Sequence, residues 1–478
     1  MSDVSIAAVG AYAPRLRIDA DEIADAWGQF HASGIEQKAV PEADEDTLTM
    51  AVEAAERALA AAGRDGSAVA HLALGTTTPP MAEEDLTARL ASMLGAPADV
   101  TTRTVTGSTR AGAQALDAAL DAGPWGEDIA LVIASDCPRG EPDSEREHAA
   151  GAGAAAFVLE RDGPGTIVDR ASHVEPYPGT RFRTTGDDET TGLGVTQYDR
   201  EAFTTTLGGA TSALEESLDV DAAAVQSPDG KLPYRATDAL GVSVADISAA
   251  ETVSTLGDTG AASVFLGAAT AFEDGADRLL IAAYGSGAGA NAFVVDGAAP
   301  VATSLEGDTD LSYAEYLRRR GEITSDEPEG GGAYVSVPSW QRTIPQRHRL
   351  VAGRCPNCTA LNFPADGACH DCNEVPDEYE PVELPGTGTV EAVTQIEQGG
   401  APPEFVEQQS KSGAFVSAVV AFDGPDGEGT VSAPTQVLIG GDDVVGVGDD
   451  VETTIRRIYT QEGVIRYGFK AQLTDAKR

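Results

Sequence analysis

Four cysteines form two matched pairs in the last third of the sequence. The run RCPNCTALNFPADGACHDCN contains Cys355 and Cys358, and then Cys369 and Cys372. Each CxxC pair can hold one metal ion from a tight turn, and four thiolates are the ligand set that tetrahedral zinc prefers. We therefore predict a structural zinc site with four protein ligands, which leave no coordination position for water. His370, inside the second pair, is an alternative ligand.

A second stretch with chemical interest is TVTGSTRAGAQALDAAL, residues 104–120. It predicts a glycine turn followed by an alanine-rich buried helix, with Ser108 and Thr109 at the helix entrance. A hydroxyl is a poor nucleophile unless a base lies next to it. What this entrance can do depends on the elements that surround it.

Two segments of the chain repeat the same order of elements. The first reads AGAQALDAALDAG, EDIALVIASD and GAGAAAFVLERDG, and the second reads GAASVFLGAATAFEDG, ADRLLIAAYGSG and GANAFVVDG. In each, a small-residue helix stops at a glycine, a buried strand follows at 129–134 or 279–283, and a further strand surrounds Phe157 or Phe293. The pattern predicts two similar α/β halves, each with a sheet covered by helices. Chance similarity between alanine-rich segments is the alternative.

Other patterns complete the expected layout. The run DEDTLTMAVEAAERALAAAGRDG predicts a helix with an acidic entrance, and AHLALGTTT predicts a strand that ends in a threonine turn. Residues 324–332, TSDEPEGGG, have the composition of a linker. After the cysteines, short alternating strands predict a small closed barrel, for which the OB type is one choice.

Composition limits the classes of function. The 478 residues, 42% of them hydrophobic, suffice for two to four globular domains. The formal charge of -45 arises from 77 acidic against 32 basic residues. Nothing in the sequence forms a basic stripe, so we expect no nucleic-acid partner. A halophile's solvated surface explains this charge better than an acidic partner-binding face. No long apolar run and no secretion signal is visible, so we expect no membrane contact and a cytoplasmic location.

Several of these runs together resemble one family. EDTLTMAVEAA, LVIASDC, EREHAAGAGAAAFVLE, SPDGKLP, LGDTGAAS, AAYGSGAGANAF and YAEYLRRRG resemble consecutive motifs of hydroxymethylglutaryl-CoA synthases of the thiolase superfamily, in the same order. The tail, RHRLVAGRCPNC to YGFKAQL, resembles the zinc-ribbon and OB-fold proteins that accompany archaeal thiolases and synthases.

The resemblance implies a domain layout and a set of ligands. The fold would be a duplicated thiolase-like α/β fold, layered α-β-α-β-α, with halves at 1–163 and 164–335. A zinc ribbon with its linker would occupy 336–375 and an OB fold 376–478. The expected ligand is a CoA thioester, and the expected assembly is a homodimer.

All four catalytic positions of that family are substituted here. The nucleophilic cysteine at a helix N-terminus is Thr109, although the Arg-Ala-Gly that follows it matches the family. The other three positions hold Thr77, Gln226 and Asp258, where the family has glutamate, histidine and asparagine. Since neither the histidine nor the glutamate is present, Thr109 lacks the base that a hydroxyl nucleophile needs.

Three further residues are candidates for roles at the site. Lys231 in SPDGK matches the family's lysine and is expected to contact CoA or to form a structural pair. Cys137 is expected to be a packed small residue, with a displaced nucleophile as the alternative. His148 is expected at the surface or at a helix cap, with acid–base catalysis as the alternative.

Three hypotheses follow. The first is a noncatalytic acyl-CoA-binding protein that acts as partner or scaffold of a catalytic thiolase, an acetyl-CoA acetyltransferase. The second is a carbon–carbon lyase, an aldolase or an acyltransferase on CoA thioesters, with Asp258, His148 or a tyrosine as acid and base. The third is ordinary hydroxymethylglutaryl-CoA synthesis, which needs an acyl-enzyme on Thr109 or Cys137.

The charge predicts a dependence on salt. At about 1 M salt the Debye length is roughly 3 Å, and it grows to about 10 Å at 0.1 M. Dilution from molar to about 0.1 M salt is therefore expected to unfold or dissociate the protein, because its acidic residues then repel one another. Circular dichroism and light scattering during the dilution test this, and a structure that persists at 0.1 M would contradict it.

Overall fold

The chain falls into two compact units. The computed structural model describes residues 4–323, 335–397, 405–427, 429–440 and 443–474. The first unit is Met1–Pro41 with Asp46–Tyr316, and the second is Glu42–Glu45 with Leu317–Arg478. The linker predicted at 324–332 lies outside the described residues. No helix in the described part of the chain is long and apolar enough to cross a membrane.

One sheet of ten strands forms the frame of the first unit. Its order is β5-β4-β6-β7-β1-β8-β11-β10-β9, with β12 paired to β1. The strands are β1 (Val4–Tyr12), β4 (Val69–Thr76), β5 (Thr101–Thr106), β6 (Ile129–Asp136), β7 (Gly153–Arg161), β8 (Gly165–His173), β9 (Ala222–Val225), β10 (Arg278–Gly285), β11 (Gly289–Asp296) and β12 (Val301–Ser304). β4–β6 and β9–β10 are parallel pairs, whereas β6–β7 and β10–β11 are antiparallel, so the predicted repeat is confirmed.

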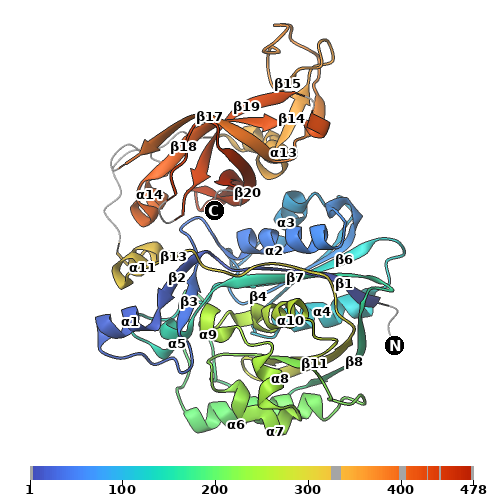
Figure 1. The fold of residues 1–478 in the computed structure, drawn as a ribbon, viewed down its shortest axis with the longest axis vertical. Coiled ribbons are helices and arrows are strands. Elements are labelled where there is room, and N and C mark those ends of the chain that lie inside the picture. The colour runs from blue at the N-terminus through green and yellow to red at the C-terminus, as the bar shows by residue number, and fades with distance from the viewer. Residues whose placement is uncertain (1–3, 324–334, 398–404, 428, 441–442, 475–478) are drawn as a thin grey trace. The chain divides into compact units, whose positions relative to one another are not determined.

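The two sheet halves are not separate, as the repeat alone had suggested. They are continuous through β1 and β8, which pair at only two positions, Ser5 with Thr166 and Ile6 with Gly165. Figure 1 shows the five layers that result: helices, one half of the sheet, a central helix layer, the other half, and outer helices. The α-β-α-β-α layering that the sequence resemblance implied is therefore confirmed.

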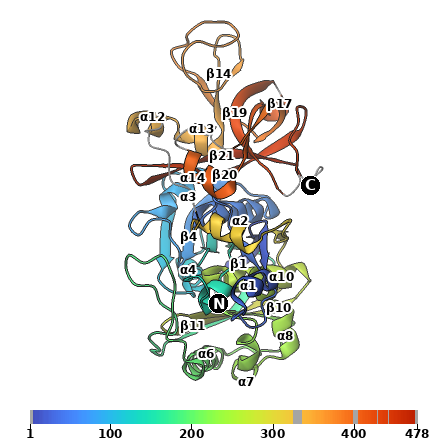
Figure 2. The ribbon, with the colours of Figure 1, turned by 90° about the vertical axis from the view of Figure 1, so that its left-hand side faces the viewer.

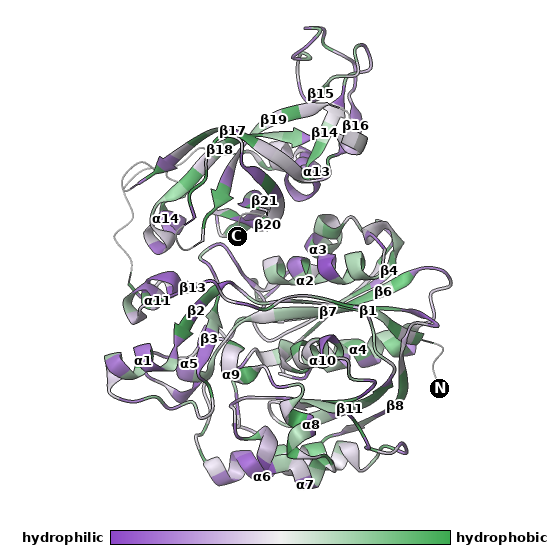
Figure 3. Ribbon diagram, viewed as in Figure 1, coloured by the Kyte–Doolittle hydropathy of each residue, from purple (hydrophilic) through white to green (hydrophobic). Residues whose placement is uncertain are grey.

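Helices cover both outer faces and fill the space between the sheet halves. α2 and α3 cover one face, α4 and α10 form the central layer, and α6, α7 and α8 lie outside β11 (Figure 1; Figure 2). Their bounds are α2 (Thr47–Ala61), α3 (Leu86–Leu94), α4 (Ala111–Ala122), α6 (Thr196–Thr211), α7 (Thr237–Leu240), α8 (Val244–Ser248) and α10 (Ser263–Glu273). Shorter helices are α1 (Ala20–Trp27), α5 (Glu145–Ala149), α9 (Val253–Leu256) and α11 (Tyr313–Arg320), and a small sheet joins β2 (Leu16–Asp19), β3 (Gln37–Val40) and β13 (Thr309–Asp310). In Figure 3 hydrophilic residues gather on outer helices such as α1 and α6.

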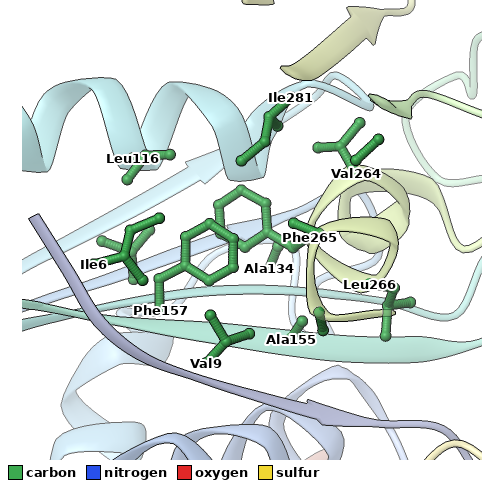
Figure 4. Packing of buried hydrophobic residues seen from close by; sticks show 14 of the residues in the cluster. Ile6, Val9, Leu116, Ala134, Ala155, Phe157, Val264, Phe265, Leu266 and Ile281 are labelled. Atoms are coloured by element: carbon green, nitrogen blue, oxygen red, sulfur yellow. The ribbon is translucent and has the colours of Figure 1, made fainter. Parts of the chain in front are cut away.

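Small residues let the central helices approach the sheet closely. A Cβ on Gly75 in β4 would lie 2.4 Å from the main-chain nitrogen of Gly112 in α4, and a Cβ on Gly112 would lie 2.7 Å from the Cβ of Ala134 in β6, so neither position has room for a side chain. Between α10 and β7, the rings of Phe265 and Phe157 stack with centroids 4.2 Å apart (Figure 4). The alanine and glycine content of these helices is therefore a packing requirement of a helix layer held between two sheet halves.

The second unit combines a barrel with a smaller sheet. The barrel closes in the order β17-β18-β19-β21-β20, five strands as expected of an OB-type fold, and the smaller sheet has the order β15-β14-β16. The strands are β14 (Val351–Arg354), β15 (Leu361–Asn362), β16 (Glu380–Glu383), β17 (Thr387–Ile396), β18 (Phe415–Asp423), β19 (Thr430–Leu438), β20 (Asp450–Gln461) and β21 (Val464–Leu473), and the helices are α12 (Val337–Arg342), α13 (Ile344–Arg349) and α14 (Val406–Ser412).

Buried ion pairs tie the short segment Glu42–Glu45 into the second unit. Lys470 in β21 lies 2.6 Å from Asp44, and Arg456 in β20 lies 3.2 Å from Glu45, with all four side chains buried. Removing one partner would leave an uncompensated buried charge, which is strongly destabilising.

Candidate functional site

Thr109 lies at the entrance of α4, and its hydroxyl hydrogen-bonds to two main-chain groups. The helix begins at Ala111, and Thr109 is buried two residues before it. Its Oγ1 donates to the carbonyl oxygen of Tyr284 at 2.7 Å and accepts from the nitrogen of Ser286 at 3.1 Å. The proton of this hydroxyl is therefore directed at a carbonyl, which cannot remove it.

Thr77 follows β4 and belongs to a different cluster. Its nitrogen and Oγ1 both donate to the carboxylate of Asp136, each at 2.7 Å. Asp136 ends β6, is completely buried, and also accepts from Thr76 and Thr78 and from the nitrogen of Ala261. The threonine turn thus supplies hydrogen bonds to the buried carboxylate of Asp136, a residue that was not among the candidates predicted from the sequence.

Gln226 follows β9 and has only half of its amide satisfied. Its side chain is 2% exposed, and Nε2 donates to the carbonyl of Gly260 at 2.7 Å. Oε1 is buried and has no hydrogen-bond partner among the described residues.

Asp258 follows α9 and is held by an arginine. One carboxylate oxygen pairs with Arg181 Nη1, and the other accepts from the nitrogen of Gly260 at 3.0 Å. Gly260 has a φ of +55°, and a Cβ there would lie 2.1 Å from Asp136 Oδ2. Only glycine fits this turn, which therefore places Asp258 next to the Asp136 cluster.

A pocket joins several of these residues. It has about 390 Å³ of empty space, including its opening, and its lining includes Thr109, Arg146, Arg181, Asp199, Gln226 and Tyr284. Of the four predicted catalytic positions, Thr109 and Gln226 line this pocket. Asp258 is not a lining residue, but it forms an ion pair with Arg181, which is one. Thr77 is not among the lining residues.

The pocket wall carries charges that the sequence did not predict. Arg146 comes from α5, Asp199 from the first turn of α6, and Arg181 from the segment between β8 and α6. Burial lowers the pKa of Arg146 and raises that of Asp199, which Arg146 opposes only in part. Burial also raises the pKa of Tyr284 to about 12, so its hydroxyl stays protonated.

Lys231 lies in the loop that borders the pocket. Its neighbours Pro228 and Leu232 are lining residues, and the Lys231 side chain is exposed. The loop is fixed where Gly230 meets Gly34, because a Cβ on Gly230 would lie 2.3 Å from the Gly34 carbonyl oxygen. Whether Lys231 contacts CoA stays a prediction.

The other two candidates do not line the pocket. The surface position expected for His148 is wrong, because the side chain is 0% exposed and its ring stacks with those of Phe30 and His31, each at a centroid distance of 5.2 Å. Burial lowers the pKa of His148. Cys137 is partly buried against Thr47 and Thr78, and burial raises its pKa to about 11, so it stays a thiol at neutral pH.

The four paired cysteines meet at one point of the second unit. Their sulfur atoms all lie within 4.8 Å of one another, with Cys355–Cys372 at 3.8 Å and Cys358–Cys369 at 3.6 Å. Tetrahedral zinc with Zn–S bonds of about 2.3 Å needs sulfurs about 3.8 Å apart, so this donor set fits the metal. His370 is not in the cluster: its Nδ1 lies 3.1 Å from Asn362 Oδ1.

Comparisons with known proteins find different relatives for the cysteine module and for the part of the chain that precedes it. Residues 342–376 match the family model of the ChsH2 rubredoxin-like zinc ribbon domain, so the cysteine module is a zinc ribbon that binds structural zinc. The chain is 30% identical over 345 residues to the hydroxymethylglutaryl-CoA synthase of Methanocella arvoryzae, which covers 68% of this chain and 99% of the relative. The corresponding synthase of Thermococcus onnurineus is 30% identical over 348 residues, covering 68% and 94%.

Solved structures show the same fold. An HMG-CoA synthase complexed with CoA superposes with a TM-score of 0.61 at 18% identity, covering 70% of this chain and 94% of the other. MvaS in complex with 3-hydroxy-3-methylglutaryl coenzyme A gives a TM-score of 0.58 at 19% identity, covering 70% and 95%.

Zinc removal is expected to unfold the ribbon. Binding of structural zinc supplies folding free energy of about 10 kcal/mol or more in small zinc modules, and it is lost without the metal. Cys358→Ser should abolish stoichiometric zinc measured by mass spectrometry of the metal, and should expose residues 351–383 to proteolysis. Cys137→Ser is the matched control and should retain zinc. A Cys358→Ser protein with full protease resistance would contradict the structural role.

Proposed function

Because the chain belongs to the hydroxymethylglutaryl-CoA synthase family, we propose that it binds acyl-CoA in the pocket beside Thr109 and does not form an acyl-enzyme there. Two similar solved structures hold CoA or 3-hydroxy-3-methylglutaryl coenzyme A, which supports a CoA thioester as the ligand. The protein then acts as partner or scaffold of a catalytic acetyl-CoA acetyltransferase, as a homodimer.

The observation that carries this proposal is the bonding of the Thr109 hydroxyl. Attack on a thioester requires that Oγ1 lose its proton to a base. Here the proton is donated to the Tyr284 carbonyl, and the oxygen accepts from Ser286. Loss of a nucleophile or its base costs roughly 10⁴ to 10⁶ in rate in hydrolases, so covalent turnover at this position is not expected.

The base positions lead to the same conclusion. Gln226 is an amide with no useful basicity, and Thr77 donates its hydroxyl to Asp136. The carboxylate of Asp258, the one ionisable group of the four, is paired with Arg181.

The geometry disfavours the alternative that the protein is a lyase or an aldolase. Of its candidate acids and bases, Asp258 is held in an ion pair and His148 does not line the pocket. Tyr284 does line it, but with a pKa raised to about 12 it can donate a proton and cannot serve as a base. A binding role therefore fits the geometry better than this chemistry.

The absence of an acyl-enzyme can be measured by intact mass spectrometry. After incubation with acetyl-CoA, the wild-type protein and Thr109→Ser are expected to gain no acetyl group, while calorimetry shows that acetyl-CoA binds. Thr109→Cys is expected to capture an acetyl group slowly, because a thiol is the better nucleophile. Acetylation of Thr109 or Cys137 in the wild type would contradict the proposal, and so would a failure to bind acetyl-CoA.

The partner role can be tested with purified proteins. In molar salt, the chain is expected to coelute on size exclusion with the acetyl-CoA acetyltransferase of the same organism, and to change that enzyme's rate of acetoacetyl-CoA formation. Separate elution with an unchanged rate, at concentrations where each protein is folded, would count against a scaffold.

A further inference from the structure

Three side chains of the pocket have hydrogen-bonding capacity that the protein does not use. Gln226 Oε1 and Asp199 Oδ1 are buried oxygens without a hydrogen-bond partner in the described parts of the chain. Arg146 lines the same pocket as both of them. Since buried polar atoms in folded proteins are nearly always paired, unpaired atoms that meet at a pocket indicate what its ligand supplies.

The unpaired oxygen of Gln226 can accept a hydrogen bond from a ligand. The bond from Nε2 to the Gly260 carbonyl, at 2.7 Å, fixes which end of the amide is oxygen. Oε1 is therefore an acceptor held in one orientation by a side chain that is 2% exposed. A ligand hydroxyl or N–H would satisfy it, whereas a carbonyl or carboxylate would not.

The guanidinium of Arg146 can donate hydrogen bonds to a ligand. Its one hydrogen bond runs from Nη2 to the Thr180 carbonyl at 2.9 Å, and among the described residues it forms no ion pair within 4.0 Å. A guanidinium has five N–H donors and stays charged in proteins. Most of its donors therefore remain for a ligand oxygen.

The summed charge of the pocket disfavours an anionic ligand. Arg181 is neutralised by Asp258, and Asp199 lies in the lining that also contains Arg146. The formal charges of the two arginines and two aspartates cancel, so the wall offers no excess positive charge to an additional carboxylate. A neutral group with one donor and one acceptor matches this wall better.

We infer that the pocket selects short hydroxyacyl chains of acyl-CoA, with the chain hydroxyl donating to Gln226 Oε1 and the thioester carbonyl accepting from Arg146. Binding is noncovalent, and no bond of the ligand changes. This inference rests on the proposed function, because it requires that acyl-CoA enter the pocket. It assigns Gln226 as the residue that selects the hydroxyl and Arg146 as a binding residue for the thioester carbonyl.

Calorimetry with a set of thioesters tests the selection in molar salt. Wild-type protein is expected to bind 3-hydroxybutyryl-CoA about tenfold more tightly than butyryl-CoA, the effect of one additional buried hydrogen bond. In Gln226→Met this ratio should fall to about one, because the acceptor is gone. Arg146→Met should weaken both ligands by about tenfold and leave their ratio unchanged, and Arg146→Lys provides a charged variant in case the methionine variant does not fold.

The controls separate this inference from the function on which it rests. Gln197→Met and Arg200→Met, exposed positions of α6, should leave all affinities unchanged. Equal binding of the two ligands to wild type, or a ratio that persists in Gln226→Met, would overturn the inference while acyl-CoA binding stands. Tighter binding of glutaryl-CoA than of 3-hydroxybutyryl-CoA would overturn it in favour of an anion site. If no thioester binds, the proposed function fails together with the inference.

Discussion

The hydrogen bond from the Thr109 hydroxyl to the Tyr284 carbonyl connects the two halves of the duplicated fold at the pocket. Thr109 precedes the central helix α4 of the first half, and Tyr284 lies in β10 of the second. The same hydroxyl accepts from Ser286, so it also fixes the loop after β10. The position at which the resemblance places a nucleophile thus holds the two halves together here.

The other substitutions form one interdependent network. Gly260 donates to Asp258 and accepts from Gln226, and its missing Cβ makes room for Asp136, to which Thr77 donates. Changing one of these residues back to the type found in active synthases would leave its former partner unpaired in a buried place. The three substitutions at Thr77, Gln226 and Asp258 are therefore better understood as a set than as separate changes, whereas Thr109 has its own main-chain partners outside this network.

Much of the fold, and part of the site, could be predicted from the sequence. The zinc site follows from local spacing, and the repeated strands follow from short apolar runs between glycines. Arg146, Arg181 and Asp199 could not be predicted, because they come from segments far apart in the chain and meet only through the tertiary fold. His148 was misplaced because EREHA resembles a solvated helix turn, whereas the loop that carries Phe30 and His31 covers it.

Transfer of an acyl group to the protein, which we expect not to occur, can be detected by isotope exchange. An acyl-enzyme, even one too short-lived to isolate, would let labelled CoA exchange into unlabelled acetyl-CoA through the reverse reaction. The folded, zinc-loaded protein is expected not to accelerate this exchange above the rate in buffer. Exchange that depends on the protein and disappears in Thr109→Ala would contradict it.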